Sequence, residues 1–208
     1  MFIKFLKWLF QVGPKRMLYL VIVEVYNYFD LKLYKYNIYF KKSSSRKSYS
    51  GYSPCPYVFY SMSIFSLASM IDTRKYAFYD LGSGCGIVLF FARGQGFKSV
   101  KGYEVDREVF LVSLKNFPML NVENIDCRNI TYLNQHSVFF IYEICAVAIF
   151  DEILDRLVHV KDHYLIIIHN EYRLSYLNSL ANKNYITMDS YAFTEKKGYS
   201  IFKSSHTT

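Results

Sequence analysis

Between residues 76 and 180, short apolar runs alternate with segments in which apolar and polar positions follow a helical period. The apolar runs are rich in Val, Ile, Tyr and Phe and predict strands, whereas the periodic segments predict helices. The predicted strands cover 76–82, 99–106, 122–130, 137–144 and 163–170, and the predicted helices cover 87–96, 107–117, 148–160 and 172–182. This alternation is typical of a doubly wound α/β fold, in which helices cover both faces of a mostly parallel sheet.

Two further segments extend this series at its ends. Residues 56–71 predict a helix that precedes the first strand. Residues 185–203 predict two strands that are joined by a turn containing Gly198. We therefore expect a mostly parallel, seven-stranded sheet with an antiparallel C-terminal hairpin.

The first 50 residues differ from the rest of the chain in charge and pattern. They carry ten Lys or Arg against two acids, whereas residues 51–208 carry fifteen residues of each sign. Residues 2–12 and 16–30 predict helices separated by a Gly-Pro pair, and the Ser-rich, basic stretch 41–54 predicts a linker or loop. We expect a basic, aromatic-rich helical extension over 1–50, followed by the α/β domain over 51–208.

The helix predicted over residues 2–12 leaves two roles open. Lys4 and Lys7 form a narrow stripe among Phe, Leu and Trp side chains, which suits either a membrane interface or a helix that covers part of the main domain. The following apolar stretch is too short, and too interrupted by Glu24, to span a membrane, and no signal-peptide cleavage site follows it. Peripheral membrane contact through residues 2–12 therefore stays one of the two interpretations.

The cysteines and histidines argue against a metal site. None of the four cysteines forms a Cys-x-x-Cys pair or a cluster with histidine, so neither zinc binding nor a disulfide framework is indicated. Reduced thiols favour a cytoplasmic protein.

Glycine follows the first predicted strand at every second position. In "DLGSGCG", residues 80–86, Gly82, Gly84 and Gly86 let the backbone approach a ligand closely at the start of a helix. Glu104 ends the second predicted strand, where an acid can accept hydrogen bonds from both hydroxyls of a ribose. The unit therefore predicts a nucleoside site.

Two common nucleotide motifs are excluded. A dinucleotide fingerprint would need glycine at position 87, which is Ile87, and no Gly-Lys-Ser/Thr run occurs anywhere in the chain. Asp80, two residues before the first glycine, would repel a pyrophosphate. It suits a ligand that carries an ammonium group and a positively charged sulfur.

"DLGSGCG" followed by "GYEVD" resembles motif I and the next acidic motif of class I S-adenosylmethionine-dependent methyltransferases. The resemblance covers about residues 50–203 and implies a Rossmann-like class I methyltransferase fold with S-adenosylmethionine as cofactor. "GYSPCPYVF" and "GFKSVKGYEVD" are similar to a pattern of small bacterial methyltransferases, which eukaryotic lysine methyltransferases of the ATP-synthase subunit type share.

The resemblance also implies a role for individual residues. Asp80 and Gly82 line the amino and carboxylate groups of the methionine part, and Glu104 binds the ribose hydroxyls with Val105 against the adenine. The adenine amine meets either Asp126 or Asn129. The remaining expected cofactor contacts are Leu81, Ser83, Gly84, Gly86, Tyr142 and, from the loop before the first helix, Tyr52.

Methyl transfer from a sulfonium is an in-line displacement, for which the protein mainly aligns the acceptor and, for a hydroxyl or ammonium, supplies a base. Such a base should follow the fourth or fifth strand, where Glu143 and His169 are the candidates. Relatives that methylate planar amines have Asn/Asp-Pro-Pro-Tyr after the fourth strand, and nearer relatives have Asn-Pro-Phe. This chain has Glu143-Ile144-Cys145 instead, which argues against methylation of DNA bases and of glutamine.

The acceptor stays open between a small molecule, a sugar or lipid-linked precursor and a protein side chain. A cofactor-binding protein without catalysis is an alternative, because the motif after the fourth strand is altered. RNA methylation, with residues 41–47 contacting phosphates, is a second alternative. The balanced charge of residues 51–208 argues against nucleic acid as a partner.

Overall fold

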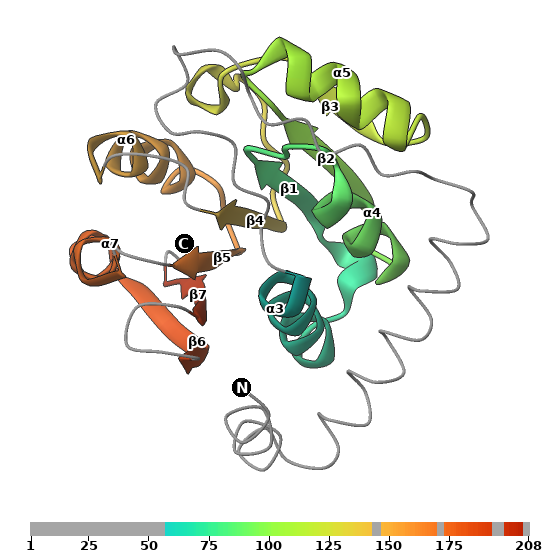
Figure 1. The fold of residues 1–208 in the computed structure, drawn as a ribbon. Coiled ribbons are helices and arrows are strands. Elements are labelled where there is room, and N and C mark those ends of the chain that lie inside the picture. The colour runs from blue at the N-terminus through green and yellow to red at the C-terminus, as the bar shows by residue number, and fades with distance from the viewer. Residues whose placement is uncertain (1–56, 143–146, 170–172, 193–197, 206–208) are drawn as a thin grey trace, which may run out of the picture. The chain divides into compact units, whose positions relative to one another are not determined.

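The computed structural model describes residues 57–142, 147–169, 173–192 and 198–205 (Figure 1). All of them belong to one compact unit, residues 39–208. The helices predicted over 2–12 and 16–30, the loop 41–54 and the boundary at residue 50 lie outside the described residues and stay predictions.

The sheet has seven strands in the order β3-β2-β1-β4-β5-β7-β6. The strands are β1 (Ala77–Leu81), β2 (Ser99–Tyr103), β3 (Asn121–Glu123), β4 (Ser137–Tyr142), β5 (His163–His169), β6 (Tyr185–Ala192) and β7 (Gly198–Ser204). Strands β1 to β5 pair in parallel, and β7 pairs antiparallel with both β5 and β6. The predicted α/β sheet with an antiparallel C-terminal hairpin is confirmed.

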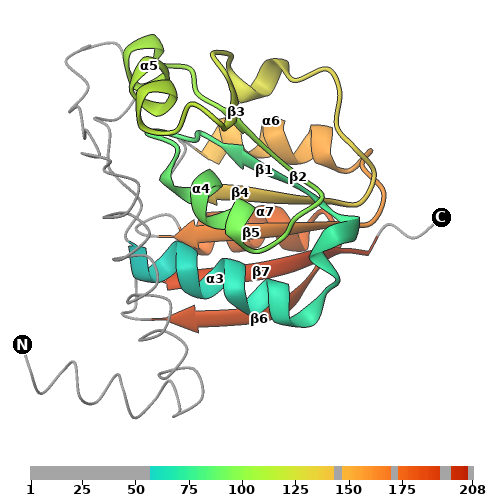
Figure 2. The same ribbon diagram turned by 90° about the vertical axis from the view of Figure 1, so that its right-hand side faces the viewer.

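Helices lie on both faces of this sheet, as predicted. Figure 1 shows α3 and α4 on one side of the strands and α6 and α7 on the other, and Figure 2 shows α3 running along β5 and β7. The helices are α3 (Tyr57–Met70), α4 (Ile87–Gly94), α5 (Arg107–Asn116), α6 (Val147–Leu157) and α7 (Arg173–Ala181). No helix among the residues listed above as described is both long and apolar enough to cross a membrane.

Alternate residues of the central strands point to opposite faces of the sheet, so each face has its own part of the core. In β1 every residue is buried, and Tyr79 faces the core under α6 and α7 while Phe78 faces α3 and α4. Phe78 lies against Phe97 and Phe140 on that second face, with ring centroids 5.1 and 6.2 Å apart. Burial on both faces explains why these strands appear in the sequence as continuous apolar runs rather than as an alternating pattern.

The third strand is shorter than predicted. The sequence predicts a strand over 122–130, but β3 ends at Glu123, and residues Cys127–Asn129 form a short 3-10 helix. The carboxylate of Asp126 accepts a hydrogen bond from the backbone N–H of Arg128 at 2.9 Å and so caps this turn. The second strand likewise ends at Tyr103 rather than at the predicted residue 106, because Asp106 caps α5.

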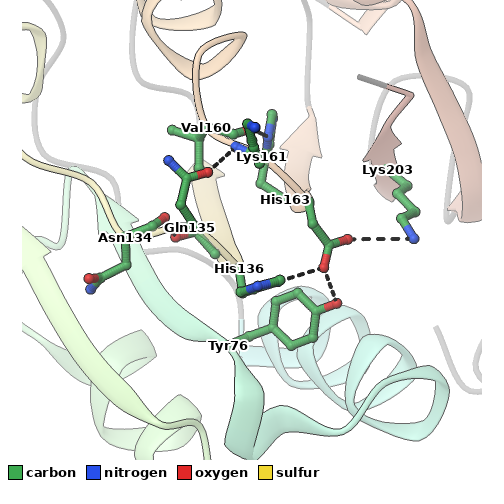
Figure 3. A network of polar contacts seen from close by, with 10 residues as sticks. Tyr76, Asn134, Gln135, His136, Val160, Lys161, His163 and Lys203 are labelled. Atoms are coloured by element: carbon green, nitrogen blue, oxygen red, sulfur yellow. Dashed lines mark hydrogen bonds and ion pairs between the residues drawn. The ribbon is translucent and has the colours of Figure 1, made fainter. Parts of the chain in front are cut away.

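A polar network joins the amino ends of the parallel strands (Figure 3). Asp162, just before β5, accepts a hydrogen bond from the Tyr76 hydroxyl at 2.8 Å and contacts Nδ1 of His136 at 2.8 Å. Nζ of Lys203, near the end of β7, lies 3.6 Å from the same carboxylate. This network joins four strands, β1, β4, β5 and β7, at the end of the sheet opposite to the glycine loop.

His163 is fully buried beside this network. Its Nδ1 lies 2.7 Å from the carbonyl oxygen of Val160, which can only accept, so Nδ1 carries the proton. Its Nε2 therefore accepts a hydrogen bond from the Tyr185 hydroxyl, also at 2.7 Å. His163 thus has a structural role that joins the starts of β5 and β6.

Candidate functional site

The glycine loop lies where the strand order reverses. From β1 the chain proceeds to β2 and β3 on one side and returns to β4 on the other, so the carboxyl end of β1 is the topological switch point of the sheet. Residues 82–86 connect β1 to α4 at this point. Parallel α/β sheets bind their ligands at such switch points.

The three predicted glycines all have left-handed backbone conformations. The φ angles are 102° at Gly82, 53° at Gly84 and 86° at Gly86, a region that side-chain-bearing residues rarely adopt. The N–H groups of Gly82 and Ser83 both donate to the carbonyl oxygen of Tyr103 at 2.9 Å, which fixes the loop against the end of β2. The N–H of Gly86 donates to the carbonyl oxygen of Ser83 at 2.9 Å.

Gly102 provides the space into which this loop packs. A Cβ atom at Gly102 would lie 2.7 Å from Cβ of Ser83 and would overlap the side chain of Leu89. The sequence reasoning missed this residue, although a glycine inside a strand is a signal of close backbone approach.

Glu104 is held in place by two backbone donors. Its Oε2 accepts from the N–H of Gly84 and its Oε1 accepts from the N–H of Asp106, each at 2.8 Å. The side chain is largely buried, and burial raises the pKa of Glu104 while the two N–H groups oppose that shift. Each oxygen keeps a second lone pair, so the carboxylate can still accept from a pair of hydroxyls.

Asp80 is the most deeply buried acid of the site. It lies in β1 with only 2% of its surface exposed, next to Gly102 of β2 and Phe140 of β4 in the strand register. No donor among the described residues reaches its Oδ2 atom, and burial together with the charge of Glu104 raises the pKa of Asp80 well above the usual range. Buried polar atoms in folded proteins are usually hydrogen-bonded, so this oxygen makes Asp80 a candidate ligand-binding group.

Two residues near Asp80 differ in the surroundings of their side chains. The hydroxyl of Ser83 is also buried without a partner among the residues that the structure describes. The side chain of Leu81, another predicted contact, belongs to the core under α6 and α7. Strand alternation places it on the face opposite to Asp80, so only its backbone can line the site.

The turn after β2 presents an apolar side chain beside Glu104. Val105 is 67% exposed, which is unusual for valine and leaves its surface available to a flat ring. Asn124 donates from Nδ2 to the carbonyl oxygens of Glu104 and Val105 at 2.7 and 3.1 Å and so fixes this turn. No sequence signal pointed to Asn124.

The two candidates for the adenine amine differ in their surroundings. Asp126 forms a two-pronged ion pair with Arg128, with its Oδ2 2.7 Å from the guanidinium, and this hydrogen bonding lowers the pKa of Asp126. Arg128 also lies 3.6 Å from Glu152 of α6. Asn129 is exposed. Asp126 is thus engaged within the protein, whereas Asn129 is accessible.

The predicted bases and Tyr142 belong to the carboxyl ends of β4 and β5. Tyr142 is the last residue of β4 and is half-buried, and His169 is the last residue of β5, where its backbone pairs with Gly198. Glu143 and Tyr52 lie outside the described residues. Within the described ranges, no cluster of three or more His, Cys, Asp or Glu residues could hold a metal ion.

No model of a protein family matches this sequence, and no curated protein matches it either. Solved structures do share its fold. The ribosomal protein L11 methylase from Lactobacillus delbrueckii subsp. bulgaricus superimposes with a TM-score of 0.54 at 14% identity, covering 68% of this chain and 77% of that one.

Two further structures contain a nucleoside ligand. Magnesium protoporphyrin IX methyltransferase from Synechocystis PCC 6803, with bound SAM, gives a TM-score of 0.54 at 12% identity, over 77% of this chain and 89% of that one. The N-methyltransferase NodS from Bradyrhizobium japonicum WM9, in complex with S-adenosyl-L-homocysteine, gives a TM-score of 0.52 at 7% identity, over 68% of this chain and 87% of that one. This chain therefore has the Rossmann-like fold of methyltransferases.

Proposed function

We propose that this protein binds S-adenosylmethionine at the carboxyl end of β1 and transfers its methyl group to an acceptor at the ends of β4 and β5. One observation carries the proposal: Glu104, held by the N–H groups of Gly84 and Asp106, lies beside the buried and unpartnered Asp80. Fold likeness at this identity supports the fold alone, so the argument for function rests on the site.

The loop is built for close approach rather than for binding phosphate. A phosphate-binding loop offers free backbone N–H groups, but here the N–H groups of Gly82, Ser83, Gly84 and Gly86 all donate within the protein. No Lys or Arg occurs between residues 76 and 92. A pyrophosphate would therefore meet two buried carboxyl groups and no Lys or Arg side chain of this segment.

A cationic nucleoside fits the same residues. Glu104 would accept from the ribose hydroxyls, Val105 would pack against the base, and Asp80 would face the ammonium group of the amino-acid end. Asn129 or Asp126 would meet the adenine amine, and Tyr52 and Tyr142 complete the proposed contacts. Bound S-adenosylmethionine would supply an electrophilic methyl group on sulfur, so the protein's remaining task is to align an acceptor.

The acceptor is proposed only as a class. The neighbours' own names include a ribosomal protein and a porphyrin, so this fold serves acceptors of different chemistry. We propose a small molecule, a sugar or lipid-linked precursor, or a protein side chain, with Glu143 and His169 as candidate bases from their places after β4 and β5. The finer kinship with ATP-synthase-subunit lysine methyltransferases rests on the sequence pattern alone.

The cellular setting follows from the sequence and is also part of the proposal. We propose a cytoplasmic enzyme whose basic extension over 1–50 precedes the catalytic domain over 51–208. Residues 2–12 would either contact a membrane surface or cover the domain. RNA as acceptor is disfavoured, because the net positive charge is confined to the extension, whereas residues 51–208 carry equal numbers of basic and acidic residues.

Calorimetric titration of S-adenosylmethionine and of S-adenosylhomocysteine tests the cofactor. We expect micromolar binding by the wild type, weakened by ~1.5–3 kcal/mol in Glu104→Ala because charge-assisted hydrogen bonds are lost. Asp155→Ala is the matched control, since Asp155 is an exposed acid on α6. Absence of binding by folded wild-type protein would overturn the proposal, and binding without turnover of any acceptor class would favour a cofactor-binding protein.

A further inference from the structure

We propose that Asp80 carries a proton in the ligand-free protein and releases it when the cationic end of the ligand binds. Cofactor affinity would then rise with pH over the range in which Asp80 is protonated. This inference rests on the proposed function, and it adds a coupling between ligand binding and proton release at that site.

The first step is the closeness of two buried carboxyl groups. Asp80 lies opposite Gly102 in the register of β1 and β2, and Glu104 follows two residues after Gly102. Their exposed fractions are 2% and 9%. Two adjacent carboxylates with little access to water are not both ionised without compensation, because desolvation and mutual repulsion disfavour the second charge.

The second step decides which of the two keeps the proton. Both oxygens of Glu104 accept a backbone N–H at 2.8 Å, and such donors stabilise the ionised form. Oδ2 of Asp80 has no donor among the described residues. The charge therefore resides on Glu104 and the proton on Asp80, and the strongly raised pKa of Asp80 agrees with this distribution.

The third step concerns positively charged side chains that could offset the charge of a second carboxylate. Strand β4 and helix α3 contain no charged residue, and the one charged residue of α4, Arg93, lies in its last turn and donates to the carbonyl oxygen of Met119 at 3.1 Å. Lys101 of β2 pairs with Glu123 at 2.8 Å. The other titratable side chains of these elements and the loop are phenols and one thiol, which carry no positive charge in either protonation state: Tyr57, Tyr60, Tyr79, Tyr103, Tyr142 and Cys85.

The ligand then provides the positive charge and the donor that these described elements do not supply to Asp80. The ammonium group of S-adenosylmethionine brings both a positive charge and N–H donors to the unpartnered oxygen. The O–H bond of Asp80 breaks, its electron pair stays on the carboxylate, and the proton passes to the buffer. Charge is conserved, because one cation enters the site and one proton leaves it.

Calorimetry in buffers of different ionisation enthalpy measures this proton directly. At about pH 5.5 and 6.5 an α-amino group is fully protonated, so the ligand itself releases none. We expect proton release on binding of S-adenosylmethionine or S-adenosylhomocysteine, approaching one proton per ligand at pH values below the titration midpoint of Asp80, and close to none for 5′-methylthioadenosine, which lacks the amino-acid end. The affinity for S-adenosylmethionine should rise by up to about tenfold per pH unit.

Two variants and a direct titration make the result decisive. Asp80→Asn should bind weakly with no proton release and no pH-dependent affinity, whereas Asp155→Asn should behave as the wild type. Carboxyl carbon NMR of the ligand-free protein should give Asp80 a titration midpoint well above the ordinary value of about 3.9. A low midpoint, or tight binding without proton release, would overturn the inference while leaving the cofactor proposal intact. A high midpoint without nucleoside binding would instead remove the cofactor proposal and the coupling with it.

Discussion

The backbone N–H of Gly84 donates to Oε2 of Glu104 at 2.8 Å, and this single bond joins the loop after β1 to the acid after β2. The bond places the carboxylate before any ligand arrives. It also depends on the left-handed conformation of Gly84, which turns the N–H toward β2. Loop conformation and acid position are therefore one feature of the site.

We expect Gly84→Ala to weaken cofactor binding and to lower stability by about 1–2 kcal/mol, since an L side chain is strained at a φ of 53°. Urea unfolding and calorimetric titration with S-adenosylmethionine measure the two effects. Gly94→Ala is the control, because Gly94 lies in α4 with open space around it and has no positive φ. That change should be neutral or stabilising by up to about 1 kcal/mol. Equal losses in both variants would contradict the assigned role of Gly84.

Gly102→Ala should be more damaging than Gly84→Ala. The new methyl group would lie 2.7 Å from Cβ of Ser83 and would overlap Leu89, both of which are buried. Overpacking of this kind costs about 1–3 kcal/mol, and relief by movement of the loop would displace Glu104 as well. We expect a lower thermal midpoint together with weaker S-adenosylmethionine binding. A stable variant with unchanged affinity would show that the loop does not depend on this contact.

The order of strands and helices could be predicted from the sequence, because the central strands are buried on both faces and glycine or a capping acid marks many of their ends. The end of β3 could not be predicted, because the capping of residues 127–129 by Asp126 depends on a local hydrogen bond from the backbone N–H of Arg128. In the site, likewise, the sequence predicts some residues but not the contacts between them. Asp80 and Glu104 were predicted from motif spacing, whereas the contact of Gly102 with Ser83 arises only when β2 and the loop pack together.

Tyr185→Phe should lower the free energy of unfolding by about 1–3 kcal/mol, because it removes the hydrogen bond that the Tyr185 hydroxyl donates to Nε2 of the fully buried His163. Chemical denaturation measures the loss. Tyr132→Phe is the matched control, since Tyr132 is 72% exposed, and its effect should stay within about 0.5 kcal/mol. Cofactor affinity should not change in either variant, because His163 begins β5 and the site lies beyond the other end of the strands. A loss of affinity in stable Tyr185→Phe protein would contradict this separation.

Asp162 should make stability depend on pH in the acid range. Burial alone would raise the pKa of Asp162, but its bonds to His136 and Tyr76 and the charge of Lys203 outweigh burial and lower it. Because the folded value lies below the ~3.9 of an unfolded chain, the carboxylate contributes stability above that pH and loses it as the pH falls through the folded value.

Asp162→Asn tests this contribution with little disturbance of the backbone, since Asp162 has a φ of 47° and asparagine tolerates that region. The pairs are partly exposed, so we expect a loss of only about 1 kcal/mol at neutral pH. Thermal unfolding from about pH 7 down to pH 3 should show the difference from wild type shrinking as the carboxylate is protonated. Asp155→Asn, which removes an exposed partner of Lys183, should show little difference at any pH. A gap between Asp162→Asn and wild type that stayed constant down to pH 3 would mean that the hydrogen bonds of Asp162 contribute independently of its charge.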